Sequence, residues 1–249
     1  MKVPAAYDLK RIAARHAHKI WHSELLAGIE GAPVYVFPDQ TAFDSDEVDQ
    51  AARAMMDHTL HLSHRRVIFE IPDRSGKEHV HVVYAQEIDG AVECVYLYRD
   101  TAKARWTDIL VHAQFDEPGV ADVEMNPATT SVEEGPTGYA TVATGIVWRA
   151  LAILAADTGM EPREIPQMRR RKLARAGVTG WEWNLVSIDL AGIRAKVFPK
   201  GGTHAAPRWH IRRGHWRNLA DGRRVFVREC EVGDKARGGV VKDYEVAAL

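Results

Sequence analysis

The chain has 249 residues, of which 46% are hydrophobic and 27% charged, and its formal net charge at pH 7 is −1. This length accommodates one large domain or two small ones with a hydrophobic core, and the composition excludes an intrinsically disordered chain. Charge is split along the sequence: residues 1–160 carry 14 Lys and Arg against 24 Asp and Glu (net −10), and residues 161–249 carry 19 against 10 (net +9).

Hydrophobic periodicity predicts two helices early in the chain, over residues 7–27 and 45–61. Ser45 is placed to cap the second helix, and acidic residues in its first turn suit the positive end of the helix dipole. A short apolar strand is expected between the helices, over 34–37.

A β-meander is expected next, with strands over 66–71, 79–88, 91–99 and 106–115. Asp89-Gly90 lies between the second and third of these, and this dipeptide is typical of tight hairpin turns. The alternation of apolar and polar residues in these runs indicates a sheet with one face on a core.

The acidic segment 116–134 contains no Lys or Arg and is expected to be rich in loops. The most apolar helix is predicted over 138–157. We interpret it as a core helix packed on the sheet, because Arg149 and several small polar residues make it unlike a membrane span.

The basic region begins with 161–166, whose two prolines favour a linker. We expect a short cationic helix over 167–176, a strand over 181–190 and a flexible connector over 200–207. The predicted fold class is α+β: an antiparallel sheet packed by two or three helices, followed by a C-terminal β-hairpin module. An acidic domain over 1–160 and the basic region over 161–249 are expected to be separate units or to pack as one domain.

The hairpin is predicted where Asp221-Gly222 separates two strand-like runs, 209–219 and 223–230. A type I′ turn at this dipeptide would place Trp216 opposite Val227. Side chains alternate along each strand, so this register gives the hairpin one apolar face and one cationic face. The cationic face would carry Arg213, His215, Arg217, Arg224 and Arg228 around Phe226.

A cationic sheet face with a central aromatic ring is typical of nucleic-acid binding, because arginine neutralises phosphate and an aromatic ring stacks on a base. The arginine run of the short helix is expected to extend this surface. The predicted residues for binding nucleic acid or a host protein are Arg170, Arg171, Lys172, Arg212, Arg213, His215, Arg217, Arg224, Phe226 and Arg228. The alternative is that these cations pair with the acidic part of the chain.

Two further functions stay open. His215 with its neighbouring arginines suits a nuclease-like toxin, with the histidine as general acid or base. The acidic segments 39–49 and 116–134 suit a protein inhibitor that mimics DNA. We predict no catalytic residue, metal site or cofactor beyond these alternatives. The histidines at 58, 61 and 64 are interpreted as surface residues, and the two cysteines, Cys94 and Cys230, form no zinc or disulfide pattern.

The C-terminal block resembles the tails of a family of uncharacterised bacteriophage and prophage proteins. The shared pattern is W-x-x-R-R-G-H-W/I-R-x-L-x-x-G-R-x-V-W-V-R, closed by G-x-V-x-x-D-Y-x-V, with Phe226 replacing a tryptophan. The matching residues here are Arg212, Arg213, Gly214, His215, Trp216, Arg217, Leu219, Gly222, Arg223, Val225, Val227, Arg228, Gly233, Gly239, Val241, Asp243, Tyr244 and Val246. The resemblance implies a phage gene product that works in the bacterial cytoplasm, in an anti-defence, toxin-like or host-takeover role, and acts mainly by binding.

Overall fold

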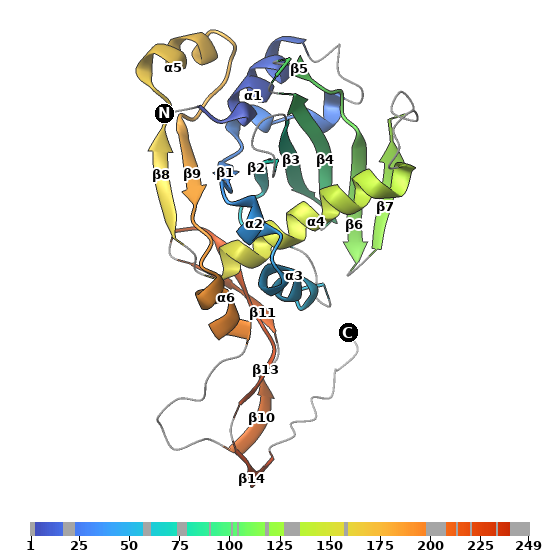
Figure 1. Ribbon diagram of the computed structural model, residues 1–249, viewed down its shortest axis with the longest axis vertical. Helices are drawn as coiled ribbons and strands as arrows, with labels where there is room; N and C mark the ends of the chain where they lie inside the picture. Colours follow the sequence, from blue (N-terminus) through green and yellow to red (C-terminus); the bar gives the residue numbers. More distant parts are fainter. Residues whose placement is uncertain are drawn as a thin grey trace.

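The computed structural model of the chain describes residues 3–16, 23–56, 61–73, 79–89, 91–100, 102–103, 105–117, 120–126, 135–156, 159–197, 208–212, 214–219, 221–232 and 234–239. Figure 1 shows a large sheet flanked by helices, with smaller strands of the C-terminal region below it. The molecule therefore has the predicted α+β class.

The large sheet of the described residues has nine strands. In sheet order they are β7 (Val120–Met125), β6 (Val111–Glu117), β4 (Ala91–Asp100), β3 (His79–Ile88), β2 (Arg66–Pro72), β1 (Val34–Val36), β9 (Glu182–Val186) and β8 (Met160–Glu164), and β5 (Arg105–Trp106) pairs with β4. The predicted meander is confirmed from β2 to β6. Strand β1 is parallel to both of its neighbours, so the sheet is mixed and not wholly antiparallel.

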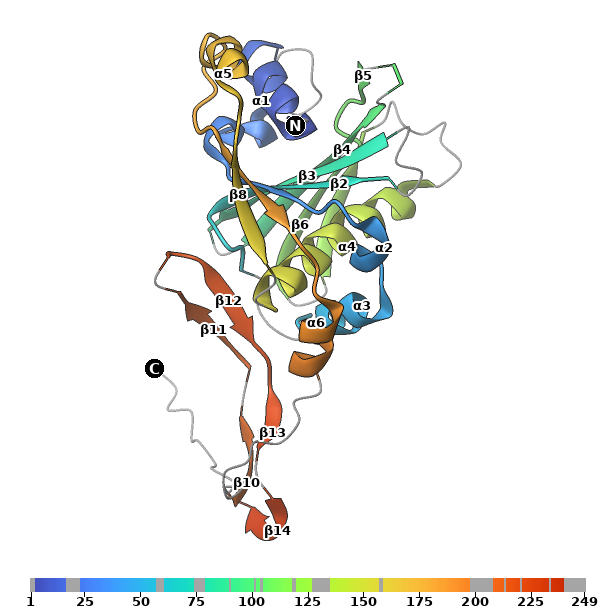
Figure 2. The same ribbon diagram turned by 60° about the vertical axis from the view of Figure 1, so that its left-hand side comes forward.

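Helices cover both faces of this sheet (Figure 2). The helices of the described residues are α1 (Ala5–His16), η2 (Ser23–Leu26), η3 (Ile29–Gly31), α2 (Gln40–Phe43), α3 (Asp46–Arg53), α4 (Gly135–Ala155), α5 (Gln167–Ala174) and α6 (Leu190–Val197). Two core clusters follow from the strand alternation. One joins α3 and α4 to residues such as Phe69, and the other joins α1 and α5 to residues such as Ile68.

Helix α4 is the central helix of the first core cluster, as its apolar composition predicted. The segment Gly138–Ala155 of this helix is long and apolar enough, by length and composition, to cross a membrane. In this structure 56% of the segment is buried inside the molecule. Contacts with α3, β4, β6 and β12 account for this burial. Such burial is what a core helix requires.

Helix α1 is fixed to the opposite face by two buried polar side chains. The Glu70 carboxylate accepts hydrogen bonds from the backbone N–H groups of Ala5 and Ala6, at 3.1 and 2.8 Å, and so caps the start of the helix. The Nζ of Lys10 donates to the carbonyl of Ala32 at 2.5 Å, and burial lowers the pKa of Lys10 to about 8. These contacts hold α1 against the sheet, where it meets α5.

The structure corrects several sequence expectations. Strand β7 lies inside the segment 116–134, which was expected to be loop-rich, and β8 replaces the predicted linker 161–166. One of the two prolines, Pro162, lies in β8, and this edge strand tolerates it because only one of its sides pairs with a neighbouring strand. Helix α6 was not expected. The first helix begins two residues earlier than predicted, at Ala5, and residues 17–22 of its predicted span lie outside the described residues. Helix α3 ends at Arg53 instead of 61.

The C-terminal region forms two small sheets in its described part. Strands β11 (His215–Asn218) and β12 (Arg224–Val227) pair as an antiparallel hairpin. Strands β13 (Cys230–Val232), β10 (Arg208–Arg212) and β14 (Asp234–Gly239) form the second sheet. The predicted connector 200–207 lies outside the described residues.

Candidate binding surfaces

The hairpin β11–β12 has a register that differs by one residue from the predicted one. Leu219 N–H donates to the Arg223 carbonyl at 2.7 Å, and Gly222 N–H donates to the Leu219 carbonyl at 3.1 Å. Gly222 has φ 85°, a left-handed conformation that glycine adopts without steric cost. The loop between the paired Leu219 and Arg223 is therefore one residue longer than a type I′ turn, and Trp216 pairs with Phe226.

This register turns Phe226 into the molecule. Its side chain is 4% exposed and belongs to the core cluster of α4. The Trp216 ring meets it edge-on, with the centroids 5.3 Å apart, and also meets the His61 ring at 5.5 Å. Of the two roles expected for Phe226, packing or stacking on a base, the structure shows packing: a one-residue slip in register changes which residues share a face, and the ring is buried and not placed to stack on a base.

Arg224 lies on the same inward face of the hairpin and forms an ion pair. Its Nη2 lies 2.5 Å from Oε2 of Glu87 in β3. His61 Nδ1 lies 2.9 Å from the other carboxylate oxygen. Burial alone would raise the pKa of Glu87, but the hydrogen bonds from His61 and Arg224 lower it overall. Arg224 thus pairs with the acidic part of the chain and is not available to a phosphate group in this structure.

The other predicted hairpin cations have different surroundings. His215 and Arg217 are exposed, whereas Arg228 is partly buried. Its Nη1 is a buried atom without a hydrogen-bond partner among the described residues, and this burial lowers the pKa of the guanidinium. Only the backbone of Arg212 is described, paired with Cys230, and Arg213 lies outside the described residues.

Helix α5 carries the second group of predicted residues. Arg170 is occupied, because its Nε donates to the Ile165 carbonyl at 2.6 Å and its Nη2 pairs with Glu164. Arg171 and Lys172 are exposed. Neither side chain has a hydrogen bond or an ion pair with any residue that the structure describes.

Four residues of this helix and its end form one exposed surface, which we call the α5 stripe: Met168, Arg171, Lys172 and Arg175. Positions i, i+3, i+4 and i+7 lie on the same side of a helix, so these side chains are neighbours. The opposite side of α5 carries Leu173, which is buried in the second core cluster. Sequence reasoning did not identify Met168, which is 90% exposed, although the helical spacing could have indicated it.

The hairpin and the α5 stripe do not form one surface. Figures 1 and 2 place α5 at one end of β8 and β9, beside α1, and the hairpin beyond the other end of these strands. The predicted extension of the hairpin surface by the arginine run of α5 is therefore wrong. Strands β8 and β9 lie between the two clusters and separate them in space.

The acidic segment 39–49 has internal functions in the described structure. Arg149 of α4 pairs with Asp44 and Asp49, at 3.4 and 3.2 Å. Glu47 pairs with Arg194 of α6. The carboxylates that would mimic DNA phosphates here mostly bind the chain's own arginines. In the other acidic segment, residues 127–134 lie outside the described residues.

Histidines and cysteines form no metal-binding cluster in the described ranges of the chain. His64 lies against Tyr35, with its Nδ1 3.1 Å from the hydroxyl, and burial lowers the pKa of His64. Of the three regularly spaced histidines, His58 lies outside the described residues. Cys94 is buried, which raises the pKa of its thiol to about 12.

Comparisons with known proteins give no match. No protein-family model matches the chain, and no curated protein and no solved structure matches it.

Proposed function

We propose that the protein acts by binding nucleic acid, and that the α5 stripe makes the first contact. One observation carries the proposal: Arg171, Lys172 and Arg175 are exposed side by side on one helix. Cations in such an arrangement neutralise successive phosphates and release counterions, which supplies most of the free energy of non-specific binding. This mode of action fits the phage-encoded accessory proteins that the tail resembles.

Two features extend this surface. Arg15 of α1 donates to the Arg175 carbonyl at 3.0 Å, so its exposed guanidinium lies beside the end of α5. Arg169 is exposed on the side of α5 that meets α1. Met168 adds an apolar contact for a sugar or an unstacked base. The surface has the mixture of charge and apolar area that single-stranded nucleic acids bind.

The hairpin offers fewer cations for nucleic-acid binding than its sequence indicated. Arg224 is paired with Glu87, and Arg223 is paired with Asp221 at 2.7 Å. A cation already paired with a carboxylate gains less from a phosphate, because the existing ion pair must be broken first. The stripe on α5 has no such competitor among the described side chains.

The test is fluorescence anisotropy with labelled single-stranded and double-stranded DNA and RNA oligonucleotides over a range of salt concentrations. We expect affinity to fall as salt rises, and the combined variant Arg171→Gln, Lys172→Gln, Arg175→Gln to reduce the slope of log K against log salt by about 2 to 3, at about 0.7 to 0.9 per lost phosphate contact. The control is Arg223→Gln on the hairpin, whose charge is already paired with Asp221 and which should leave the slope almost unchanged.

Two results would overturn the proposal: no binding at low salt, or a combined α5 variant that binds like the wild type. Capture of partners from a bacterial lysate, with and without nuclease, distinguishes nucleic-acid binding from binding to a host protein. A host protein that remains bound after nuclease treatment, and is lost from the Met168→Glu variant, would assign the α5 stripe to a protein partner instead.

A further inference from the structure

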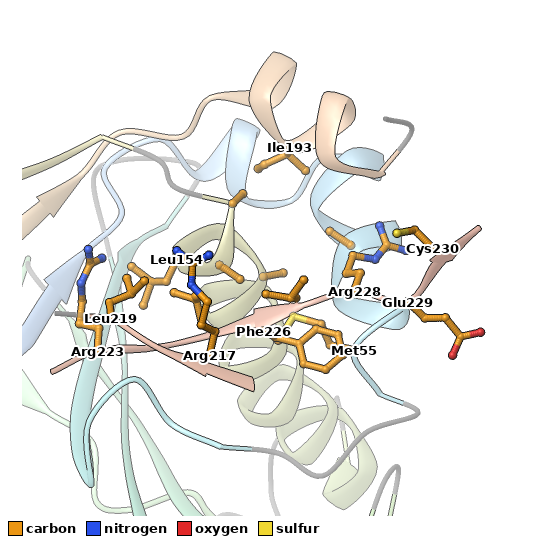
Figure 3. A pocket seen from close by; sticks show the side chains of 16 residues that line it. Met55, Leu154, Ile193, Arg217, Leu219, Arg223, Phe226, Arg228, Glu229 and Cys230 are labelled. Atoms are coloured by element: carbon orange, nitrogen blue, oxygen red, sulfur yellow. The ribbon is translucent and has the colours of Figure 1, made fainter. Parts of the chain in front are cut away.

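A cavity of about 500 Å³ lies between the hairpin and the helices α3, α4 and α6 (Figure 3). Its volume is within the range of about 300–1,000 Å³ found for small-molecule sites. The residues around it are Ala51, Met55, Ala152, Leu154, Ala155, Ala156, Ile193, Arg217, Leu219, Arg223, Val225, Phe226, Val227, Arg228, Glu229 and Cys230. The cavity lies far from the α5 stripe and is independent of the proposed nucleic-acid binding.

The helical side of the cavity is apolar. Met55, Ala152, Leu154 and Ile193 are each 5% exposed or less, and Phe226 closes the same region from the hairpin. Alanines on α3 and α4 leave space that larger side chains would fill. A lining of this kind favours a hydrocarbon or aromatic body, since burial of apolar surface is favourable and polar partners for such a body are not needed.

The hairpin side of the cavity is cationic. In Figure 3, Arg217, Arg223 and Arg228 project from the hairpin to the side on which Leu154 and Ile193 lie. Arg223 is already paired with Asp221. The one carboxylate among the lining residues is Glu229, and its side chain points away from Arg228.

Among the residues that line the cavity, Arg228 has a buried hydrogen-bond donor that lacks a partner in the described structure. Its Nη1 is buried and has no hydrogen-bond partner among the described residues. Buried donors are paired in folded proteins with few exceptions, and an exception is commonly explained by a bound water or ion. A donor that lines a cavity can be satisfied in the same way by a bound anion. A planar guanidinium binds carboxylate and phosphate oxygens through two parallel hydrogen bonds.

We propose that this cavity binds an amphipathic anion. The apolar body of the ligand lies against Met55, Ala152 and Ile193, and its carboxylate or phosphate head group accepts hydrogen bonds from Arg228. Arg217, exposed on the same side of the hairpin, adds positive charge at the entrance.

One of the two cysteines of the chain allows ligand binding in this cavity to be followed. Its two cysteines are Cys94 and Cys230. Cys230 is partly exposed and lines the cavity, whereas Cys94 is buried in the sheet and its thiol has a raised pKa. Alkylation of the native protein by N-ethylmaleimide therefore labels Cys230 selectively, and Cys230→Ser provides the unlabelled control.

The experiment measures the rate of Cys230 alkylation and, by titration calorimetry, the binding of dodecanoate, dodecyl phosphate and dodecyltrimethylammonium below their micellar concentrations. We expect one or both anions to bind and to slow alkylation about tenfold, and the cation of equal chain length to do neither. The comparison of the two anions decides which head group the site accepts.

Two variants of the same cavity locate the head group. Arg228→Met keeps an unbranched apolar side chain but removes the guanidinium, and it should weaken binding of the anion about tenfold or more, the loss expected for one charge-assisted hydrogen bond. Arg223→Met is the matched control: its charge is already compensated by Asp221, and the loss should stay below about threefold.

A third variant locates the apolar body. Ala155→Leu, at the end of α4, places a larger side chain in the cavity and should weaken the binding of each anion that the wild type binds. Circular dichroism and thermal unfolding confirm that each variant is folded. Equal binding of anionic and cationic chains, unchanged alkylation of Cys230, or wild-type affinity of folded Arg228→Met would each overturn the proposal.

Discussion

The hairpin β11–β12 and helix α5 are both rich in arginine, yet they use arginine in different ways. On the hairpin, Arg224 lies beside Glu87 and Phe226 beside the core, so charge and aromatic surface hold the hairpin to the sheet. On α5, Arg171 and Lys172 have no partner among the described residues. Clustered arginine in the sequence thus gives a structural contact in one place and an open surface in the other. The position of the nearest carboxylate decides between them.

The largest expected difference between the two regions is in packing. Phe226→Ala removes a ring from the core and should lower the free energy of unfolding by about 3–5 kcal/mol. Met168→Ala on α5 should change it by less than about 0.5 kcal/mol, because the side chain is exposed. Urea unfolding of both variants measures the two effects. Similar losses for Phe226 and Met168 would show that the hairpin is not part of the core.

A smaller effect is expected from the ion pair. Arg224→Met removes the charged arginine partner of Glu87 and leaves its carboxylate with His61 and the backbone N–H of Leu62. The loss should cost about 1–3 kcal/mol, as for a partly buried charge that loses its partner. Arg217→Met, on the paired strand of the same hairpin, should cost less than about 0.5 kcal/mol because Arg217 is exposed. If both substitutions cost the same, the contact between Arg224 and Glu87 does not stabilise the fold.

The same ion pair predicts a dependence of stability on pH. The pKa of Glu87 is lowered in the folded protein, so its contribution is complete above the pKa of the unfolded chain, about 4.3, and is lost as pH falls through the folded value. Wild type and Glu87→Gln should therefore differ most near neutral pH and converge in acid. Chemical unfolding at a series of pH values checks this, and a constant difference would contradict it.

The smallest effect on stability is expected at α5. Replacing Arg171, Lys172 and Arg175 with glutamine should change the free energy of unfolding by less than about 0.5 kcal/mol, while it weakens nucleic-acid binding. Thermal unfolding of the variant used for anisotropy provides the measurement. A large loss of stability would show that these cations stabilise the fold, as Arg224 is expected to do. The hairpin and α5 would then not differ in how they use their cations.

Periodicity predicted the elements that depend on local pattern. Alternating residues over β2, β3 and β4 and the apolar run of α4 identified the meander and its core helix, because these elements bury a face that is visible in the sequence. Strand β8 was missed because the two prolines of segment 161–166 are typical of linkers and because the pairing of β8 with β9 is not encoded locally. The parallel pairing of β1 with β2 and β9 likewise joins distant segments.

The sequence by itself determined the α+β class, the asymmetry of charge, and the two basic clusters in which the candidate residues lie. Only the tertiary structure decided which of these residues are exposed. One extra residue in the loop closed by Leu219 and Arg223 turned Phe226 inward and brought Arg224 to Glu87. The cavity beside Arg228 depends on four separate elements meeting in space. Pattern specifies faces of helices and strands, whereas register and long-range packing determine what each face meets.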